Sequence, residues 1–205
     1  MSGARRNQSL QDRSRRTRER LIEVGFSLFA RHGFDEVTVD AICAATGVAK
    51  GTFYFHFPTK QALLVAAFHR GGDEVVRHAQ DLAAAGTPFP EAVLALGARI
   101  ANNTAAVPKP LARRATIEAL AAIDGAPDDG ERHQRRRALV VLVEAGMRRG
   151  EVTAGFAPAE IAMALNWAMV QAILAWTASP GPAPTLETVM RARLTMLLAG
   201  VASRP

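Results

Sequence analysis

The chain has 205 residues, of which 49% are hydrophobic and 21% are charged, so it can bury a core in one large or two small domains and is not expected to be disordered. Its formal net charge is +6, and residues 1–70 carry the surplus, with eleven Lys and Arg against six Asp and Glu. A single cysteine, Cys43, excludes an intrachain disulfide, and a basic N-terminal third favours a polyanionic partner.

The N-terminal segment is rich in arginine. Residues 1–12 are polar and expected to be disordered, and five arginines lie between Arg13 and Arg20 at the start of a helix. Positive charge is unfavourable at a helix N-terminus, so DNA phosphate or a minor groove is the expected partner, with Arg16 as the representative contact. A solvated helix start is the alternative. No apolar run follows closely enough for a signal peptide, which predicts a cytoplasmic protein.

The stretch 38–60 predicts two short helices joined by a glycine turn. Thr38 is an N-cap residue for a helix over about 39–46, in which Val39, Ile42 and Cys43 have the apolar spacing of a helix buried on one side. Gly47 then suits the left-handed conformation that often ends a helix. A second helix is expected over about 49–55, and Pro58 ends it. The pattern is that of a helix-turn-helix.

The second of these helices has the side chains of a DNA-reading surface. Lysine offers a charge to phosphate, glycine allows close backbone approach, threonine contacts bases, and tyrosine and histidine reach phosphate oxygens. Lys60, at the next helix start, is a further phosphate candidate. Together with Arg16, the DNA-binding candidates are Thr38, Ala49, Lys50, Gly51, Thr52, Tyr54, Phe55, His56 and Lys60.

The same region resembles the DNA-binding signature of the tetracycline-repressor (TetR) family of bacterial regulators. The resemblance covers the N-terminal third of the chain, and Cys43, Thr46 and Ala49 depart from the usual residues. The matching positions are Ile42, Gly47, Val48, Gly51, Thr52, Phe53, Tyr54, His56, Phe57, Lys60 and Leu63.

The resemblance implies an all-α fold, with a three-helix DNA-binding head and a larger body that binds an effector and forms a homodimer. We expect about nine helices: a helix-turn-helix domain at 13–60, a connecting helix at 61–86, and an effector-binding and dimerisation domain at 87–205. The connecting helix is predicted to be continuous to about Ala85, although Gly71 and Gly72 weaken it.

Two helices end the chain, at about 158–178 and from Leu186 onward. The first is apolar on two sides, with Ile161, Leu165, Ala172 and Trp176 on one and Met163, Trp167, Val170 and Leu174 on the other. The second has one stripe, Leu186, Met190, Leu194, Leu197 and Val201. A helix with two apolar sides needs two partners, so the pair is predicted to form a four-helix bundle with a second chain. A membrane span over 161–178 is disfavoured by Asn166 and Gln171.

The sequence has no pattern that favours an enzyme, a metal site or a cofactor. No two of the five histidines are four residues apart, and no phosphate-binding glycine loop or nucleophile elbow occurs. A pocket for a small, apolar or aromatic effector is expected in the body. Its candidate residues are Asn103, Thr104, Met147, Met163, Asn166 and Trp167.

These features predict a homodimeric transcriptional repressor that binds a palindromic double-stranded DNA operator and responds to a small effector. A DNA-binding activator, or an architectural protein without an effector response, would share the same head. The third alternative is a helical interaction protein whose basic head binds a polyanion other than DNA.

Overall fold

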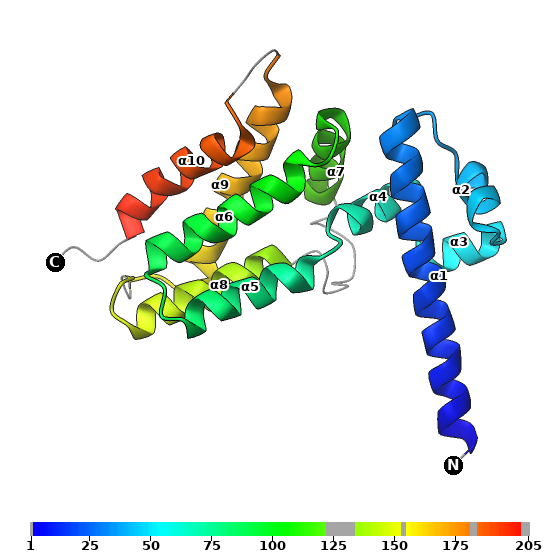
Figure 1. Ribbon diagram of the computed structural model, residues 1–205, viewed down its shortest axis with the longest axis horizontal. Coiled ribbons are helices and arrows are strands. Elements are labelled where there is room, and N and C mark those ends of the chain that lie inside the picture. The colour runs from blue at the N-terminus through cyan, green and yellow to red at the C-terminus, as the bar shows by residue number, and fades with distance from the viewer. Residues whose placement is uncertain (1, 122–133, 153–154, 181–183, 202–205) are drawn as a thin grey trace. The chain divides into compact units, whose positions relative to one another are not determined.

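The computed structural model describes residues 2–121, 134–152, 155–180 and 184–201, and these contain ten α-helices (Figure 1). The predicted all-α fold is confirmed. The chain divides into two compact units, Met1–Phe68 and His69–Pro205. The prediction of about nine helices differs by one from those described, because the expected connecting helix is two helices.

The N-terminal unit contains α1 (Ser2–His32), α2 (Val39–Thr46), α3 (Lys50–His56) and α4 (Lys60–Phe68). The long α1 lies beside α2 and α4, as Figure 1 shows. The prediction that residues 1–12 are disordered is wrong for residues 2–12, which belong to α1. The segment has no apolar stripe, yet each residue added to an existing helix gains a hydrogen bond without a new nucleation cost.

The core of this unit joins α1 to the other three helices. Large side chains from all four helices and the α1–α2 loop are buried there: Leu21, Ile22, Phe29, Phe34, Val37, Ile42, Phe53, Phe57, Leu63 and Leu64. Helix α1 packs tightly on α4 at Gly25, where an added Cβ would lie 2.6 Å from a methyl group of Leu63. Any larger residue at position 25 would therefore displace α4 or the Leu63 side chain.

The turn between α2 and α3 has the predicted geometry. The Thr38 hydroxyl accepts a hydrogen bond of 3.1 Å from the Ala41 amide at the start of α2. Gly47 has φ 70° and ψ 25°, and its amide donates to the Cys43 carbonyl at 2.9 Å. Only glycine adopts this left-handed conformation without steric cost, so the direction in which α3 leaves the turn is set locally.

The prediction of a continuous helix from Lys60 to about Ala85 is wrong. Helix α4 ends at Phe68, and α5 (Gly72–Ala84) begins after Gly71, which has φ 85° and ψ 8°. A left-handed residue cannot continue an α-helix. The pair Gly71-Gly72 was expected only to weaken a helix, but it ends one and starts another.

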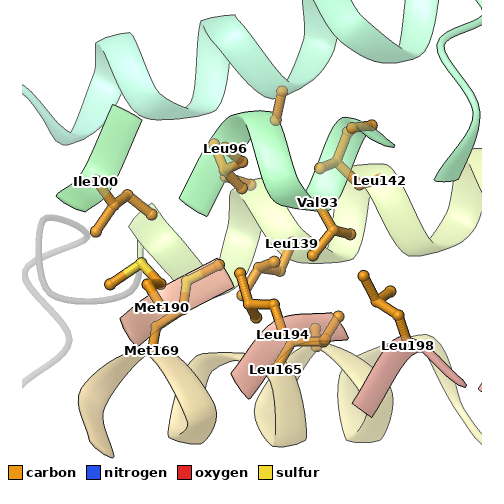
Figure 2. Close-up of a cluster of buried hydrophobic side chains, with 14 of the residues drawn as sticks. Val93, Leu96, Ile100, Leu139, Leu142, Leu165, Met169, Met190, Leu194 and Leu198 are labelled. Carbon is orange, nitrogen blue, oxygen red and sulfur yellow. The ribbon is translucent and has the colours of Figure 1, made fainter. Parts of the chain in front are cut away.

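The second unit is a bundle of α5, α6 (Phe89–Ala105), α7 (Lys109–Ala121), α8 (Gln134–Arg148), α9 (Pro158–Ala178) and α10 (Leu186–Val201). Helix α8 packs on α5 and α9, while α10 packs on α6 and α9. Figure 2 shows α6, α8, α9 and α10 contributing side chains to one core, including Leu96, Leu139, Met169 and Leu194. Helices α6 and α10 pack tightly at Gly97, where an added Cβ would lie 2.6 Å from Leu194 Cδ1.

The predicted apolar stripes of α9 and α10 are partly buried within the single chain. On one side of α9, Ile161, Leu165 and Ala172 are buried; on the other side Val170 is buried, while Met163 and Trp167 are exposed. On α10, Leu198 is buried where Leu197 was expected, while Leu197 is only partly buried against the core. The difference on α10 is a shift of one residue around the helix, which sequence periodicity resolves poorly.

Helix α9 is long and apolar enough, by composition alone, to cross a membrane. It packs against α7, α8 and α10, and 39% of its most apolar window is buried. Packing within the helical body buries part of its apolar surface and leaves Met163 and Trp167 exposed.

Candidate nucleic-acid interface

Helix α3 has one buried face and one open face. Phe53 and Phe57 are buried, and they fix the rotation of the helix. Tyr54 is 48% exposed and Phe55 is 79% exposed. Phe55 and Tyr54 thus mark the side of α3 that the N-terminal unit leaves open.

The other predicted α3 contacts lie on or beside this open face. A Cβ added at Gly51 would meet nothing within 4 Å, so a partner can approach its backbone. Thr52 is half-buried, while Ala49 and Thr38 are exposed at the helix starts. Ala49 is the N-cap of α3 and provides no side-chain hydrogen bond. The side chains of α3 are thus brought together on one surface.

Lys50 is not an isolated charge. Its Nζ lies 2.8 Å from Asp40 Oδ1 and donates to Asp40 Oδ2 at 3.1 Å, joining the first turns of α3 and α2. The hydrogen bond that Lys50 donates to Asp40 is the main cause that raises the pKa of Lys50 above its usual value. Both side chains are more than half exposed, so a phosphate can compete with Asp40 for the ammonium.

His56 is half-buried, and its pKa is lowered by burial and, to a smaller extent, by the charge of Arg18 on α1. The guanidinium of Arg18 lies 5.2 Å from the centre of the Phe57 ring. A lowered pKa keeps His56 neutral at pH 7. It can therefore donate a hydrogen bond to a phosphate but adds no positive charge.

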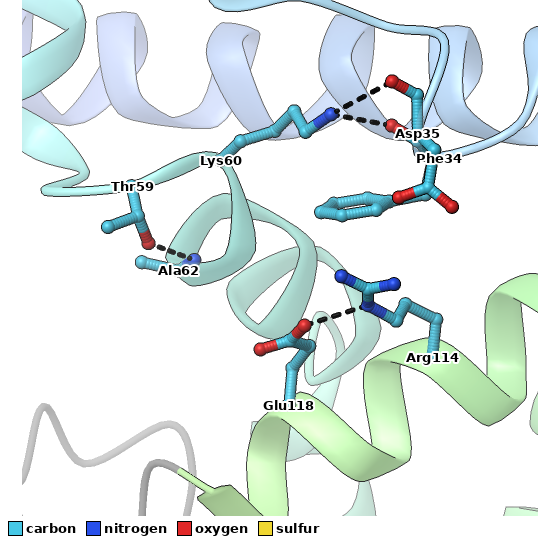
Figure 3. Close-up of polar contacts among 7 residues, drawn as sticks. All are labelled: Phe34, Asp35, Thr59, Lys60, Ala62, Arg114 and Glu118. Carbon is cyan, nitrogen blue, oxygen red and sulfur yellow. Dashed lines mark hydrogen bonds and ion pairs between the residues drawn. The ribbon is translucent and has the colours of Figure 1, made fainter.

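Lys60 does not lie as predicted. We expected its ammonium to be available to phosphate at the start of α4, but it donates to the carbonyls of Phe34 and Val37 in the α1–α2 loop, each at 2.8 Å. Figure 3 shows its hydrogen bonds to the Phe34 and Asp35 carbonyls. No local sequence pattern predicts this contact, because the partners lie more than twenty residues apart. At the same helix start, the Thr59 hydroxyl accepts from the Ala62 amide at 3.0 Å.

The exposed side of α1 carries arginines at helical spacing. Arg13, Arg16 and Arg20 are exposed and lie on one face, and no ion pair joins them to the residues that the structure describes. Arg15 differs from them, because it pairs with Asp12 at 3.6 Å and with Glu19 at 3.9 Å. Arg16 therefore lies in a row of exposed arginines that form no ion pair with the described residues.

The six effector candidates do not share one environment. Thr104 is buried, and its neighbour Asn103 is exposed. Met147 and Asn166 are half-buried, and Met147 packs against the body core. Met163 is 46% exposed and Trp167 is 45% exposed. The assignment of Asn103, Met163 and Trp167 to an enclosed pocket is not consistent with their exposure in a single chain.

No group of three or more His, Cys, Asp or Glu suited to a metal ion occurs among the described residues. The one cysteine, Cys43, is buried in α2, and burial raises its pKa. It packs as a small apolar residue in the helix-turn-helix.

Comparison with known proteins agrees with this geometry. An N-capped helix, a left-handed glycine and a second helix with an exposed polar face make up the helix-turn-helix of a transcriptional regulator. Residues 21–67 match the family described as "Bacterial regulatory proteins, tetR family". The N-terminal unit therefore carries the DNA-binding region of this family.

Curated relatives match over the same region. The HTH-type transcriptional regulator YerO of Bacillus subtilis (strain 168) is 44% identical over 50 residues, which are 24% of this chain and 17% of YerO. The HTH-type transcriptional regulator UidR of Escherichia coli (strain K12) is 33% identical over 58 residues, which are 28% of this chain and 30% of UidR. The match thus spans less than a third of either relative.

Solved structures match the fold across both units. FadR of Thermus thermophilus, a TetR-family transcriptional repressor solved with lauroyl-CoA, has a TM-score of 0.77 at 23% identity and covers 92% of this chain and 96% of its own. FadR of Bacillus subtilis, solved with stearoyl-CoA, has a TM-score of 0.67 at 16% identity and covers 89% of this chain and 98% of its own. At these identities the likeness concerns the fold.

Proposed function

We propose that the chain is a transcriptional repressor that binds a palindromic DNA operator as a homodimer and releases it when a small molecule binds in the body. The observation that carries the proposal is the open face of α3, where Thr52, Tyr54 and Phe55 project from a helix fixed by two buried phenylalanines. A helix of this kind fits the major groove, where base edges are distinguishable. A protein that reads chromosomal DNA in a bacterium acts in the cytoplasm.

Dimerisation through α9 and α10 is supported by apolar side chains that a single chain leaves exposed. Met163 and Trp167 are one helical turn apart on α9, and Met196 on α10 is 71% exposed. The two helices pack on each other. An apolar face over two adjacent helices is typical of a surface that a second copy covers, and two heads would then read two half-sites.

The effector is proposed to be a small molecule with a large apolar part. Body helices contribute mainly aliphatic and methionine side chains to the core, so an uncharged or aromatic group would find suitable contacts there. Thr104, Met147 and Asn166 are the retained pocket candidates. The two FadR structures were solved with lauroyl-CoA and stearoyl-CoA, which makes a long acyl chain the first class to test.

Release requires that the effector bind more tightly to a state that cannot hold both half-sites. A molecule with equal affinity for both states would leave DNA binding unchanged. Titration of lauroyl-CoA into the protein–DNA complex therefore tests the response directly. An activator or architectural protein would keep its DNA under this titration.

Binding to DNA is tested with a duplex that the protein itself selects from a random-sequence pool, compared with a random duplex of equal length. Thr52→Ala and Tyr54→Ala are each expected to lower the ratio of selected to random affinity about 5- to 100-fold, the value of one or two base contacts. Equal affinity of the wild-type protein for the two duplexes at moderate salt would rule out a sequence-specific repressor and favour an architectural protein.

A further inference from the structure

The ammonium group of Lys60 has all three of its donors directed at one loop. Nζ donates to the Phe34 and Val37 carbonyls, each at 2.8 Å, and to the Asp35 carbonyl at 3.4 Å. A lysine ammonium has three N–H donors and no acceptor. Figure 3 shows the side chain extending from the start of α4 toward this loop. In this conformation no donor remains for a phosphate oxygen.

An aromatic contact adds to these hydrogen bonds. Nζ lies 4.3 Å from the centre of the Phe34 ring, within the range of a cation–π interaction. The ring is itself buried, with its centre 5.1 Å from that of Phe29 on α1. The charge is therefore held both by the loop carbonyls and by a ring that belongs to the core. An exposed lysine that binds phosphate would need neither the carbonyl hydrogen bonds nor the contact with the ring.

The loop that Lys60 holds sets the position of the helix-turn-helix. Val37 directly precedes Thr38, the N-cap of α2, so the bond to the Val37 carbonyl fixes the chain one residue before the cap. Loop carbonyls lack the partners that a helix provides, and partly buried ones must be satisfied by another group. Because the Gly47 turn joins α2 rigidly to α3, a displaced Thr38 would move the open face of α3.

We propose that Lys60 is a positioning residue that holds the α1–α2 loop, and through it α2 and α3, and that it is not a phosphate contact. The inference rests on the proposed function, because the position of α3 matters only if α3 reads DNA. It also corrects the role that Lys60 was expected to have from the sequence.

The two roles give different salt dependences. Loss of a phosphate contact lowers the slope of log affinity against log salt by about 0.9 and weakens all duplexes alike. Loss of a positioning residue leaves that slope unchanged and lowers the affinity for the selected duplex more than that for random DNA. Lys50 provides the matched control, since it is an exposed lysine of the same unit with its ammonium on the open side of α3.

The experiment measures binding of Lys60→Met, Lys60→Arg and Lys50→Met to the selected and the random duplex from 50 to 300 mM salt. Lys60→Met is expected to lower the selected-to-random ratio about tenfold, the value of one lost base contact, with the slope unchanged. Lys60→Arg keeps the charge, but its planar fork cannot direct three donors at carbonyls around one nitrogen, so it is expected not to restore the ratio. Lys50→Met should lower the slope and keep the ratio.

A second measurement needs no DNA. Amide hydrogen exchange at residues 36–42 of the free protein is expected to be faster in Lys60→Met than in the wild type, and unchanged in Lys50→Met. A slope lowered by about 0.9 in Lys60→Met, full activity of Lys60→Arg, or unchanged exchange at residues 36–42 would each overturn the inference. If the wild-type protein prefers no duplex, the proposed function fails, and the exchange measurement alone decides the role of Lys60.

Discussion

Lys50 Nζ lies 2.8 Å from Asp40 Oδ1, so the first residue of α3 is tied to the first turn of α2 by an exposed ion pair. As an exposed pair it adds little to the packing of the two helices, but it places a carboxylate beside the surface that would meet phosphate. Replacement of Asp40 should therefore strengthen DNA binding.

Asp40→Asn is expected to raise the affinity for selected and random duplexes alike at low salt and to steepen the salt slope by at most about 0.9, because one lysine becomes fully available to phosphate. Fluorescence anisotropy over a salt series provides the measurement. Glu36→Gln is the control, since it removes the same charge from an exposed position in the preceding loop. If Glu36→Gln produces the same change, net charge rather than release of Lys50 is responsible.

The arginine row of α1 allows a comparison between neighbours. Arg16 is exposed without an ion pair to the described residues, and Arg15 pairs with Asp12 and Glu19. If the row binds phosphate, Arg16→Gln should lower the salt slope by about 0.9 and keep the selected-to-random ratio, while Arg15→Gln should change the slope less. Equal effects of the two variants would contradict a specific role for the row formed by Arg13, Arg16 and Arg20.

Local geometry explains which parts of this site were predictable from the sequence. The Thr38 cap bonds an amide three residues on, and the Gly47 turn bonds a carbonyl four residues back, so residue type and spacing determine both. The buried face of α3 follows from the spacing of Phe53 and Phe57. In these cases the sequence pattern and the physical contact span the same few residues.

The contacts that were missed join distant residues or depend on the chain around them. Lys60 binds the carbonyl of Phe34, 26 residues earlier, and Lys50 binds Asp40 across the turn. No spacing rule relates such pairs. Similarly, the glycines at 71 and 72 are compatible with a weakened helix and with a break, and only the left-handed conformation of Gly71 decides between them.

The exposed apolar face of α9 leads to a prediction about assembly. Trp167→Glu places a charge at the centre of the face that we assign to the dimer, and burial of an unpaired carboxylate is costly. The variant is expected to be monomeric in light scattering and to lose affinity for a two-half-site duplex, with its helix content unchanged. Ile117→Glu, on α7 at 43% exposure, is the control and should remain a dimer. A dimeric Trp167→Glu protein would place the interface elsewhere.

Glu151 caps a helix that is far from it in the sequence. Its Oε2 accepts from the Phe89 amide at the start of α6 at 2.6 Å, and its Oε1 lies 2.6 Å from Arg149 Nε. Arg149 also donates to the Thr87 carbonyl at 2.9 Å, so the end of α8 is joined to the start of α6. The bond from Arg149 is the main cause that lowers the pKa of Glu151 below its ordinary value of about 4.5.

This shift makes part of the stability of the body dependent on pH. A carboxylate whose pKa is lowered by folding stabilises the protein above its unfolded pKa, and the contribution is lost as the pH falls through the lower, folded pKa. Glu151→Gln keeps a hydrogen-bond acceptor for Phe89 but has no charge. We expect Glu151→Gln to lower the free energy of unfolding by about 1 kcal/mol at pH 7, the value of a partly exposed charge-assisted pair. The difference in free energy of unfolding from wild type should shrink steadily below pH 4.5. Urea unfolding at pH 7, 5, 4 and 3 measures this difference.

Glu91→Gln, which removes an exposed charge from the first turn of α6, is the control and should show a smaller difference from wild type at pH 7. A difference between Glu151→Gln and wild type that stays constant down to pH 3 would mean that the Glu151 charge is not what stabilises the start of α6.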